Sequence, residues 1–329
     1  MNKEKLGIFK ETIANAHSIL IIQADNPDGD SLASALALES LFHGQNKETK
    51  LFCRVQIPKH LRYLSGWDRV ENEIPNNVDT AIIVDASQWS LLEAFNNPLN
   101  LSKIKNKPVF VLDHHDYESD LPFKTISVID SKAVATGEII YELAQKLDWD
   151  LGDIGREMIA ISILYDSLGL STESTTPRSI RIIADLVEKG VSLAKIDADR
   201  RETMKRSAEI MRYKAALMNR IEFYNDGKLA LIEIPWEEIE KFGDQYNPPM
   251  LVLDEMRLVI GVEIAVALKY YNNNKVTGKI RSSFGSPISA KLAENFGGGG
   301  HSYAAGFKII DRSNKNIKQE VIDYTKQLL

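Results

Sequence analysis

The sequence predicts an α/β protein in which a mainly parallel sheet, flanked by helices, is joined by a helical connector to a smaller α/β domain. Two observations lead to this fold class. In the first half, short β-rich runs alternate with helical patterns, as they do in βαβ units. In the second half, a further set of strands and helices follows a long polar helical stretch. The chain has 329 residues, the length of about two domains.

The elements of the first half follow one another in a regular order. The apolar run SILIIQ begins the series, and the helical pattern SLASALALESLF follows it. Strands are predicted at 18–23, 51–56, 80–84, 108–112 and 124–129, and helices at 31–42, 135–147, 152–164 and 178–189. Strands alternating with helices in this way form parallel sheets, whose sites lie beyond the carboxyl ends of the strands.

The second half begins with a stretch free of Pro and Gly and rich in Lys, Arg, Glu, Met and Ala. We interpret it as one continuous helix that connects two domains. We therefore expect a first domain at 1–191, a helical connector at 192–223 and a second domain at 224–329. Within the second domain, strands are predicted at 229–234, 262–270, 275–281 and 304–310, and helices at 286–295 and 316–328.

Charge and cysteine content narrow the class of protein. The net charge of −6, from 40 basic and 46 acidic residues, argues against a general polyanion-coating protein. A local basic region at 265–310 has six Lys or Arg residues and one acid, which suits a small phosphorylated ligand. The single cysteine, Cys53, excludes an internal disulfide and favours a reducing compartment. With neither a signal-peptide pattern nor a run of about 20 apolar residues, we expect a cytoplasmic protein.

Acidic and imidazole side chains follow three successive predicted strands. NPDGD, with Asp28 and Asp30, comes after the first strand, and Asp85 ends the strand at 80–84. Asp113, His114 and His115 end the strand at 108–112, and Asp166 follows a later apolar helical run. Because these strand ends share one edge of a parallel sheet, the side chains form a mixed oxygen and nitrogen donor set. Such a set suits Mn²⁺, or less well Mg²⁺ or Fe²⁺, and several carboxylates suggest a two-metal centre.

A glycine run marks the second domain. Gly297, Gly298, Gly299 and Gly300 precede His301. Glycines let the backbone approach a ligand closely and direct N–H groups at an anion. Arg281 ends the preceding predicted strand and is a candidate ligand of the same anion.

The strings NPDGD, VDAS, VLDHH, YDSLG and GGGGH, in this order, resemble the DHH phosphoesterase superfamily with its DHH-associated C-terminal domain. The chain is most similar to the type that includes nanoRNases, phosphoadenosine-phosphate phosphatases and cyclic-dinucleotide phosphodiesterases. Family II inorganic pyrophosphatases and exopolyphosphatases carry a Ser-Arg-Lys motif that this sequence lacks.

The resemblance implies a phosphodiesterase or phosphatase with two Mn²⁺ ions and a hydroxide nucleophile. Asp28 and Asp30 would each bind one ion, Asp85 would bridge them, and His114 and Asp166 would complete the second site. His115 would act on the substrate as a phosphate ligand or general acid, and Asp113 would orient the histidines.

The resemblance also implies how substrate is bound. Arg281 and the glycine segment with Gly298, Gly299, Gly300 and His301 would grip it, together with His115, in a cleft between the domains. The expected partners are short RNA or DNA oligonucleotides, dinucleotides or phosphorylated nucleotides, with no membrane, and a homodimer is plausible.

One position departs from the family pattern. Ala24 stands where the family has a metal-binding His, three residues before Pro27. Asp25 or Gln23 could substitute for it, water could fill the gap, or the first metal site could be weak or lost. The main alternative to an enzyme is therefore a degenerate member that binds nucleotides or short RNA without efficient hydrolysis. A third alternative, an α/β scaffold without a site, would require five motif matches by accident.

Overall fold

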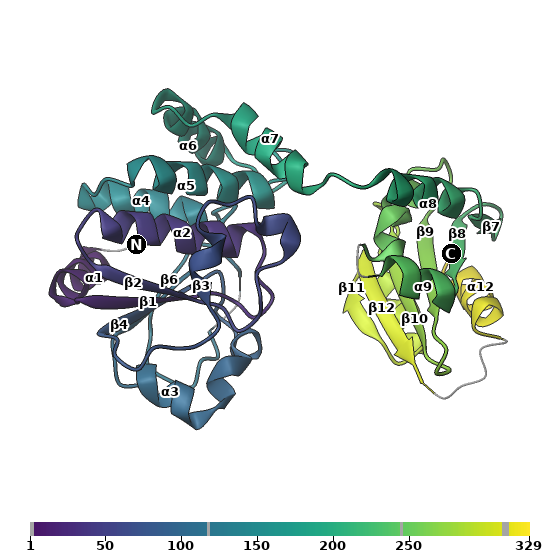
Figure 1. The fold of residues 1–329 in the computed structure, drawn as a ribbon, viewed down its shortest axis with the longest axis horizontal. Helices are drawn as coiled ribbons and strands as arrows, with labels where there is room; N and C mark the ends of the chain where they lie inside the picture. Colours follow the sequence, from purple (N-terminus) through teal and green to yellow (C-terminus); the bar gives the residue numbers. More distant parts are fainter. Residues whose placement is uncertain (1–2, 117–118, 244–245, 311–315) are drawn as a thin grey trace. The chain divides into compact units, whose positions relative to one another are not determined.

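The computed structural model describes residues 3–116, 119–243, 246–310 and 316–329. The chain divides into two compact units, Met1–Lys205 and Arg206–Leu329. Each unit has its own sheet (Figure 1) and its own hydrophobic core.

The first unit contains a six-stranded sheet in the order β3-β2-β1-β4-β5-β6. Each pair of neighbouring strands is parallel, which confirms the predicted mainly parallel sheet. The strands are β1 (Ser18–Ile22), β2 (Glu48–Phe52), β3 (Val70–Glu71), β4 (Thr80–Val84), β5 (Val109–Asp113) and β6 (Ile126–Ile129).

Helices cover both faces of this sheet (Figure 1). One face packs against a core that includes α2, α4 and α5, and the opposite face packs against α3 and two 3-10 turns. The helices are α1 (Lys3–Asn15), α2 (Gly29–His43), α3 (Pro98–Ile104), α4 (Thr136–Leu147), α5 (Gly152–Asp166), α6 (Pro177–Glu188) and α7 (Leu193–Thr203), with 3-10 turns at Lys59–Leu61, Trp67–Arg69, Trp89–Leu91 and Glu93–Asn96.

The central strands are apolar because both of their faces are covered. Along β1, Ile19 and Ile21 enter the core on the α2 side, whereas Leu20 and Ile22 enter the core on the α3 side. Strand β4 is likewise buried at every residue. This two-sided burial is typical of parallel sheets and explains why the runs read as strands without polar alternation.

The predicted continuous helix at 192–223 is wrong. The structure has two helices here, α7 and α8 (Ala208–Met218), separated by a break at 204–207. Ser207 begins the second helix, where its hydroxyl accepts a hydrogen bond from the Ile210 N–H. Serine competes for backbone hydrogen bonds and so favours helix starts. The boundary between the two compact units also falls in this break, after Lys205.

The second unit contains a six-stranded sheet in the order β11-β12-β10-β9-β8-β7. Its pairs are antiparallel except for the parallel pair of β8 and β9. The strands are β7 (Glu222–Tyr224), β8 (Leu229–Ile234), β9 (Ile264–Tyr270), β10 (Val276–Ser282), β11 (Gly299–His301) and β12 (Ala304–Ile309).

Helices pack on both faces of the second sheet. On one face, α8, α9 and α10 pack over β8 and β9, and on the other face α11 and α12 pack over the central strands. These helices are α9 (Trp236–Phe242), α10 (Leu253–Arg257), α11 (Ser289–Asn295) and α12 (Ile317–Leu328), with a 3-10 turn at Pro248–Leu251.

The last part of the glycine run, with His301, forms strand β11. Gly299 pairs with Gly306 and His301 pairs with Ala304. A Cβ on Gly298 would lie 2.2 Å from the Gly306 carbonyl oxygen. Glycine is therefore needed here for the close approach of two backbones.

The helices of the described chain include none that is both long enough and apolar enough to cross a membrane.

Candidate metal and phosphoester site

The candidate site lies at one edge of the first sheet. Asp28 and Asp30 follow β1, Asp85 follows β4, and Asp113 is the last residue of β5. Because β1, β4 and β5 are parallel neighbours, their carboxyl ends meet at the same edge. Asp166, the last residue of α5, joins this group from the helical layer.

His114 lies among three of the predicted carboxylates. Its Nε2 atom is 3.2 Å from Asp166 Oδ2, 3.5 Å from Asp85 Oδ1 and 3.6 Å from Asp30 Oδ2. Asp30 and Asp85 are buried, and the His114 side chain is 14% exposed. Residues separated by more than a hundred positions in the sequence thus share a single small volume.

His115 belongs to a second group of donors. Its Nδ1 atom is 2.8 Å from Asp113 Oδ1 and 3.5 Å from Asp85 Oδ1. The backbone N–H of His115 also donates to Asp113 Oδ1 over 3.2 Å. The imidazole is 43% exposed, so the structure combines a buried histidine and a solvent-accessible one in consecutive positions.

The pKa values of the cluster indicate that its carboxylates repel one another when they are charged. Burial, together with the nearby charge of Asp30, raises the pKa of Asp85 well above its usual value. Burial also raises the pKa of Asp166 to about 6. Desolvation lowers the pKa of His114, but the adjacent carboxylates of Asp166 and Asp85 outweigh it and raise that pKa to about 11. Packed carboxylates of this kind are neutralised by a proton or by a cation.

Asp30 is held by donors that the sequence analysis did not identify. Its Oδ2 accepts from the Thr136 N–H over 2.7 Å, and its Oδ1 accepts from the Ser162 hydroxyl over 2.5 Å and from the Ser34 hydroxyl over 2.9 Å. The Gly137 N–H, at the start of α4, is 3.4 Å from Oδ1. The N-terminal turn of α4 therefore orients this carboxylate, as helix N-termini do for anions. Thr136 and Gly137, near the start of the predicted helix at 135–147, are the sequence signal from which this contact could have been predicted.

Asp85 has an uncommon backbone conformation. Its φ of 55° lies in the left-handed region, which Asp and Asn tolerate better than most residues. The Thr136 hydroxyl lies 3.5 Å from Asp85 Oδ1. Left-handed non-glycine residues concentrate at functional sites, and here the turn places the carboxylate next to both histidines.

Asp28 lies outside both groups of potential ligands. Its Oδ1 accepts a hydrogen bond from the Ser31 N–H and caps the start of α2. Burial raises the pKa of Asp28, and the charge of Asp30 adds to this effect, so the carboxylate is within electrostatic reach of the cluster.

The residues beside Ala24 differ in their availability. Asp25 is engaged elsewhere, because its Oδ2 is 3.1 Å from Arg54 Nε and accepts from the Glu93 N–H over 2.6 Å. Gln23 is fully buried, and among the described residues neither polar atom of its side chain has a hydrogen-bond partner. Of the two candidates for replacing the missing histidine, Asp25 is thus already committed to Arg54.

Among the described residues, two sets of side chains have donor atoms close enough to hold a metal ion. The sets are Asp85, His114 and His115, and Asp30, His114 and Asp166; within each, the donor atoms lie within 4.8 Å of one another. The His114 Nε2 atom is buried and makes no well-aligned hydrogen bond to the residues described. Carboxylate oxygens with imidazole nitrogens, and no thiolate, match the preference of divalent cations such as Mn²⁺. The residues present therefore fit a metal centre.

Apart from His115, the predicted phosphate-binding residues lie in the second unit. Arg281 is half-buried on β10, where it pairs with Ala304 of β12. Gly298 precedes β11, and Gly299, Gly300 and His301 form that exposed strand. Since Ala304 also pairs with His301, Arg281 and His301 belong to the same cross-strand row and face the same side of the sheet.

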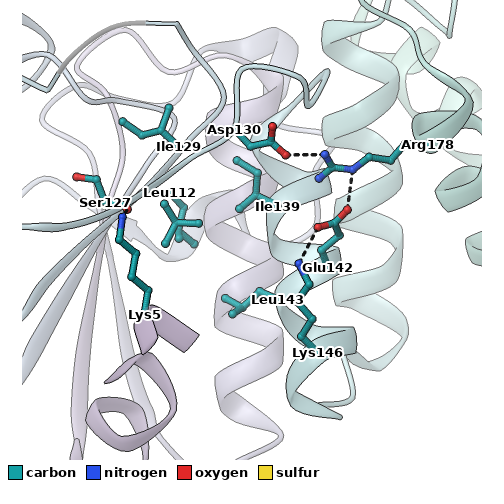
Figure 2. Close-up of a pocket in the computed structure, with 11 residues that line it drawn as sticks. Lys5, Leu112, Ser127, Ile129, Asp130, Ile139, Glu142, Leu143, Lys146 and Arg178 are labelled. Atoms are coloured by element: carbon teal, nitrogen blue, oxygen red, sulfur yellow. Dashed lines mark hydrogen bonds and ion pairs between the residues drawn. The ribbon is translucent and has the colours of Figure 1, made fainter. Parts of the chain in front are cut away.

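A separate cavity of about 370 Å³ lies between β6 and α4 and contains none of the predicted site residues (Figure 2). The Arg178 guanidinium contacts both Asp130 and Glu142, and Lys146 also contacts Glu142. Lys5 donates to the Ser127 carbonyl of the edge strand β6. These charges are paired with one another and cover a strand edge, so we interpret this cavity as structural.

The architecture and the site define the class of protein: a doubly covered parallel α/β domain with a carboxylate and histidine cluster at the carboxyl edge of its sheet. Residues 18–165 match the family described as "DHH family, N-terminal domain". Residues 18–165 therefore form a domain of the DHH family, and the chain as a whole resembles the nanoRNase and phosphoadenosine-phosphate phosphatase type of that family.

Relatives match most of the chain. A Bacillus subtilis protein named bifunctional oligoribonuclease and PAP phosphatase NrnA is 22% identical, with 91% of each chain covered. Its namesake from Thermus thermophilus is 25% identical, over 92% of this chain and 88% of that protein. A crystal structure of an exopolyphosphatase-related protein from Bacteroides fragilis shares the fold, with a TM-score of 0.83, 20% identity and coverage of 99% of this chain and 98% of that one. The family match and the two NrnA relatives support hydrolase activity on phosphoesters, whereas the likeness to the crystal structure shows the shared fold.

Proposed function

We propose that this protein is a Mn²⁺-dependent phosphoesterase that hydrolyses short oligonucleotides, linear or cyclic dinucleotides, or phosphoadenosine phosphate. The observation that carries the proposal is the cluster around His114, where three carboxylates lie within 3.6 Å of one imidazole nitrogen. The family match and the names of the full-length relatives support this choice of reaction.

We assign the metal ligands to the first unit. Asp30, His114 and Asp166 would hold one ion, Asp28 would contribute to another, and Asp85 would serve both. Divalent ions bound there would polarise a phosphoryl oxygen and lower the pKa of water. The hydrogen bonds from Thr136 and Ser162 would hold Asp30 in its ligating orientation, as second-layer partners of metal ligands commonly do.

His115 would act as the general acid for the leaving group. Asp113 holds its Nδ1 atom at 2.8 Å, which fixes the ring and leaves Nε2 as the atom that exchanges a proton with substrate. The partial exposure of this imidazole allows a substrate oxygen to reach it. Asp113 is thus a positioning residue, and its own pKa, raised by burial but lowered more strongly by hydrogen bonds that include His115, lies below the usual value.

The second unit would bind the phosphates of the substrate. Arg281, His301 and the glycines Gly298, Gly299 and Gly300 supply one cation, one imidazole and backbone N–H groups on or beside strands β10 and β11. This modest positive surface suits a substrate with few phosphates better than a long polymer.

The alternative is a binder without efficient catalysis, motivated by Ala24. The structure favours hydrolysis, because the cluster of Asp30, Asp85, His114 and Asp166 assembles without a ligand from position 24. Hydrolysis of a 5′-phosphorylated adenine dinucleotide with and without Mn²⁺ tests the choice, with Asp85→Asn measured beside the parent. Release of mononucleotide by the parent alone supports the enzyme; binding without release by a protein saturated with Mn²⁺ supports the binder.

Two further expectations accompany the proposal. The buried thiol of Cys53 suits a reducing compartment, so we place the proposed activity in the cytoplasm. A homodimer is proposed from the resemblance, and light scattering of the purified chain tests it.

A further inference from the structure

Besides Arg281, two lysines, Lys279 and Lys269, lie on the same face of the second sheet. Arg281 and Lys279 are two residues apart on β10, so their side chains point to the same face at roughly 7 Å along the strand. Lys269 pairs with Thr277, and Lys279 pairs with Ala267, which makes Lys269 the diagonal neighbour of Lys279. Diagonal pairs of this kind lie within reach of long side chains.

The helices of the second unit cover this part of the face only in part. Ala265 and Ala267 on β9 are buried beneath the core that includes α8, α9 and α10. Lys279 and Arg281 on the next strand are only half-buried. Beyond them, Gly306 and Gly299 occupy the same cross-strand row as Lys279. Because Gly306 and Gly299 have no side chains, a ligand can approach the backbone beside Lys279 closely.

In the parts of the chain that the structure describes, no carboxylate pairs with these cations. Among the ion pairs of the described residues, none joins Lys269, Lys279 or Arg281 to an Asp or Glu. The contacts they do make are weak or neutral: Lys279 Nζ with Met250 Sδ at 3.6 Å, Lys269 Nζ with Asn247 Oδ1 at 3.4 Å and with the Tyr271 ring at 5.6 Å from its centroid, and Arg281 with a backbone carbonyl. Lys318 of the same unit, by contrast, is paired with both Glu222 and Glu233.

The electrostatics agree with this geometry. Partial burial lowers the pKa of Lys279, and the neighbouring charges of Arg281 and Lys269 lower it further. Like charges held together without a counter-ion repel one another, and an anion on the face relieves that repulsion.

We propose that Lys279, supported by Lys269, forms a second phosphate subsite, next to the one assigned to Arg281, that takes the adjacent phosphate of a short oligonucleotide. The proposal rests on the proposed function, because it extends the assigned phosphate site by one nucleotide. It gives the protein a preference for ligands with two successive phosphates over ligands with one.

Binding to the full chain in EDTA tests the subsite without hydrolysis. AMP carries one phosphate, and the 5′-phosphorylated adenine dinucleotide pApA carries two. Lys279→Gln is expected to weaken pApA binding about tenfold and AMP binding less than twofold. The slope of log affinity against log salt for pApA should fall by about 0.7, the value for one lost contact to a single strand. Lys279→Arg should retain most of the affinity.

Two matched variants complete the experiment. Arg281→Gln should weaken both ligands. Lys291→Gln removes an exposed lysine from α11, which covers the opposite face, and should change neither. Equal losses for AMP and pApA in Lys279→Gln, or no loss for either, would overturn the subsite. A parent chain that binds with the expected pattern but never hydrolyses pApA with Mn²⁺ would retain the subsite and reject the proposed catalysis.

Discussion

The Ser162 hydroxyl donates a hydrogen bond of 2.5 Å to Asp30 Oδ1 and accepts one of 3.0 Å from the Gly137 N–H. A single side chain on α5 thus links a candidate metal ligand on α2 to the first turn of α4. The three helices also pack tightly here, because a Cβ on Gly137 would lie 2.1 Å from the Ser162 hydroxyl. The orientation of Asp30 is therefore a property of the whole helical layer.

Ser162→Ala is expected to weaken Mn²⁺ binding by about tenfold or more, the usual effect of removing a partner of a metal ligand. It should also lower the free energy of unfolding by about 1–3 kcal/mol, because the buried Gly137 N–H loses an acceptor. Calorimetric titration with Mn²⁺ and urea unfolding measure the two effects. Ser289→Ala, which breaks the buried Ser282–Ser289 pair of the second unit, should lower stability without changing Mn²⁺ affinity.

Asp85→Asn should separate stability from function. Burial and the charge of Asp30 raise the pKa of Asp85, so a neutral amide relieves repulsion in the metal-free protein, and Asn tolerates the left-handed backbone. We expect metal-free Asp85→Asn to be at least as stable as the parent, while Mn²⁺ no longer stabilises it. Thermal unfolding with and without Mn²⁺ measures both effects. A variant that Mn²⁺ stabilises as strongly as the parent would contradict the assignment of Asp85 as a metal ligand.

Gly29→Ala should disturb the site through Tyr165. An added Cβ would lie 2.1 Å from the Tyr165 ring, so we expect a loss of about 1–3 kcal/mol from overpacking and weaker Mn²⁺ binding, since Asp166 follows Tyr165. The double variant Gly29→Ala/Tyr165→Leu should recover part of the stability. Gly7→Ala, in α1 with no atom within 4 Å of the added Cβ, should be neutral or slightly stabilising. Equal unfolding curves for Gly7→Ala and Gly29→Ala would contradict the packing argument.

Adjacent glycines of β11 should respond differently to alanine. A Cβ on Gly299 meets no atom within 4 Å, whereas Gly300 has a φ of 143° and its Cβ would lie 2.6 Å from Ala305 Cα. Gly300→Ala should therefore lower stability by more than about 1 kcal/mol. Gly299→Ala should leave unfolding unchanged but weaken pApA binding, because its methyl group enters the row of Lys279. Unchanged pApA affinity in Gly299→Ala would show that no ligand approaches this strand.

Cys53 should be unreactive in the folded chain. Burial raises the pKa of its thiol from 9.0 to about 11, so at pH 8 the thiolate fraction is about a hundredfold lower than for a free cysteine. Iodoacetamide labelling should be slow in buffer and fast in urea. Because the unfolded thiol loses its proton first, this group should reduce stability as the pH rises from 9 toward 11. Rapid labelling at pH 8 without denaturant would contradict its burial.

Local sequence patterns predicted the parts of the fold that depend on neighbouring residues. The strands at Thr80–Val84 and Leu229–Ile234 have the predicted bounds, because apolar β-rich runs next to turn residues carry their own signal. The elements that these patterns missed include helix α3 and strand β11. Helix α3 is only seven residues long, and β11 consists of glycines that become a strand only by pairing with β12.

For the site, the sequence alone determined which acids and histidines follow successive parallel strands, because strand order and direction place their ends at one edge. Only the tertiary structure decided which of them meet. It brought Asp166 to His114, engaged Asp25 with Arg54 and directed the α4 N–H groups at Asp30. These contacts join residues far apart in the chain. They depend on how helices pack across the sheet, which no local pattern encodes.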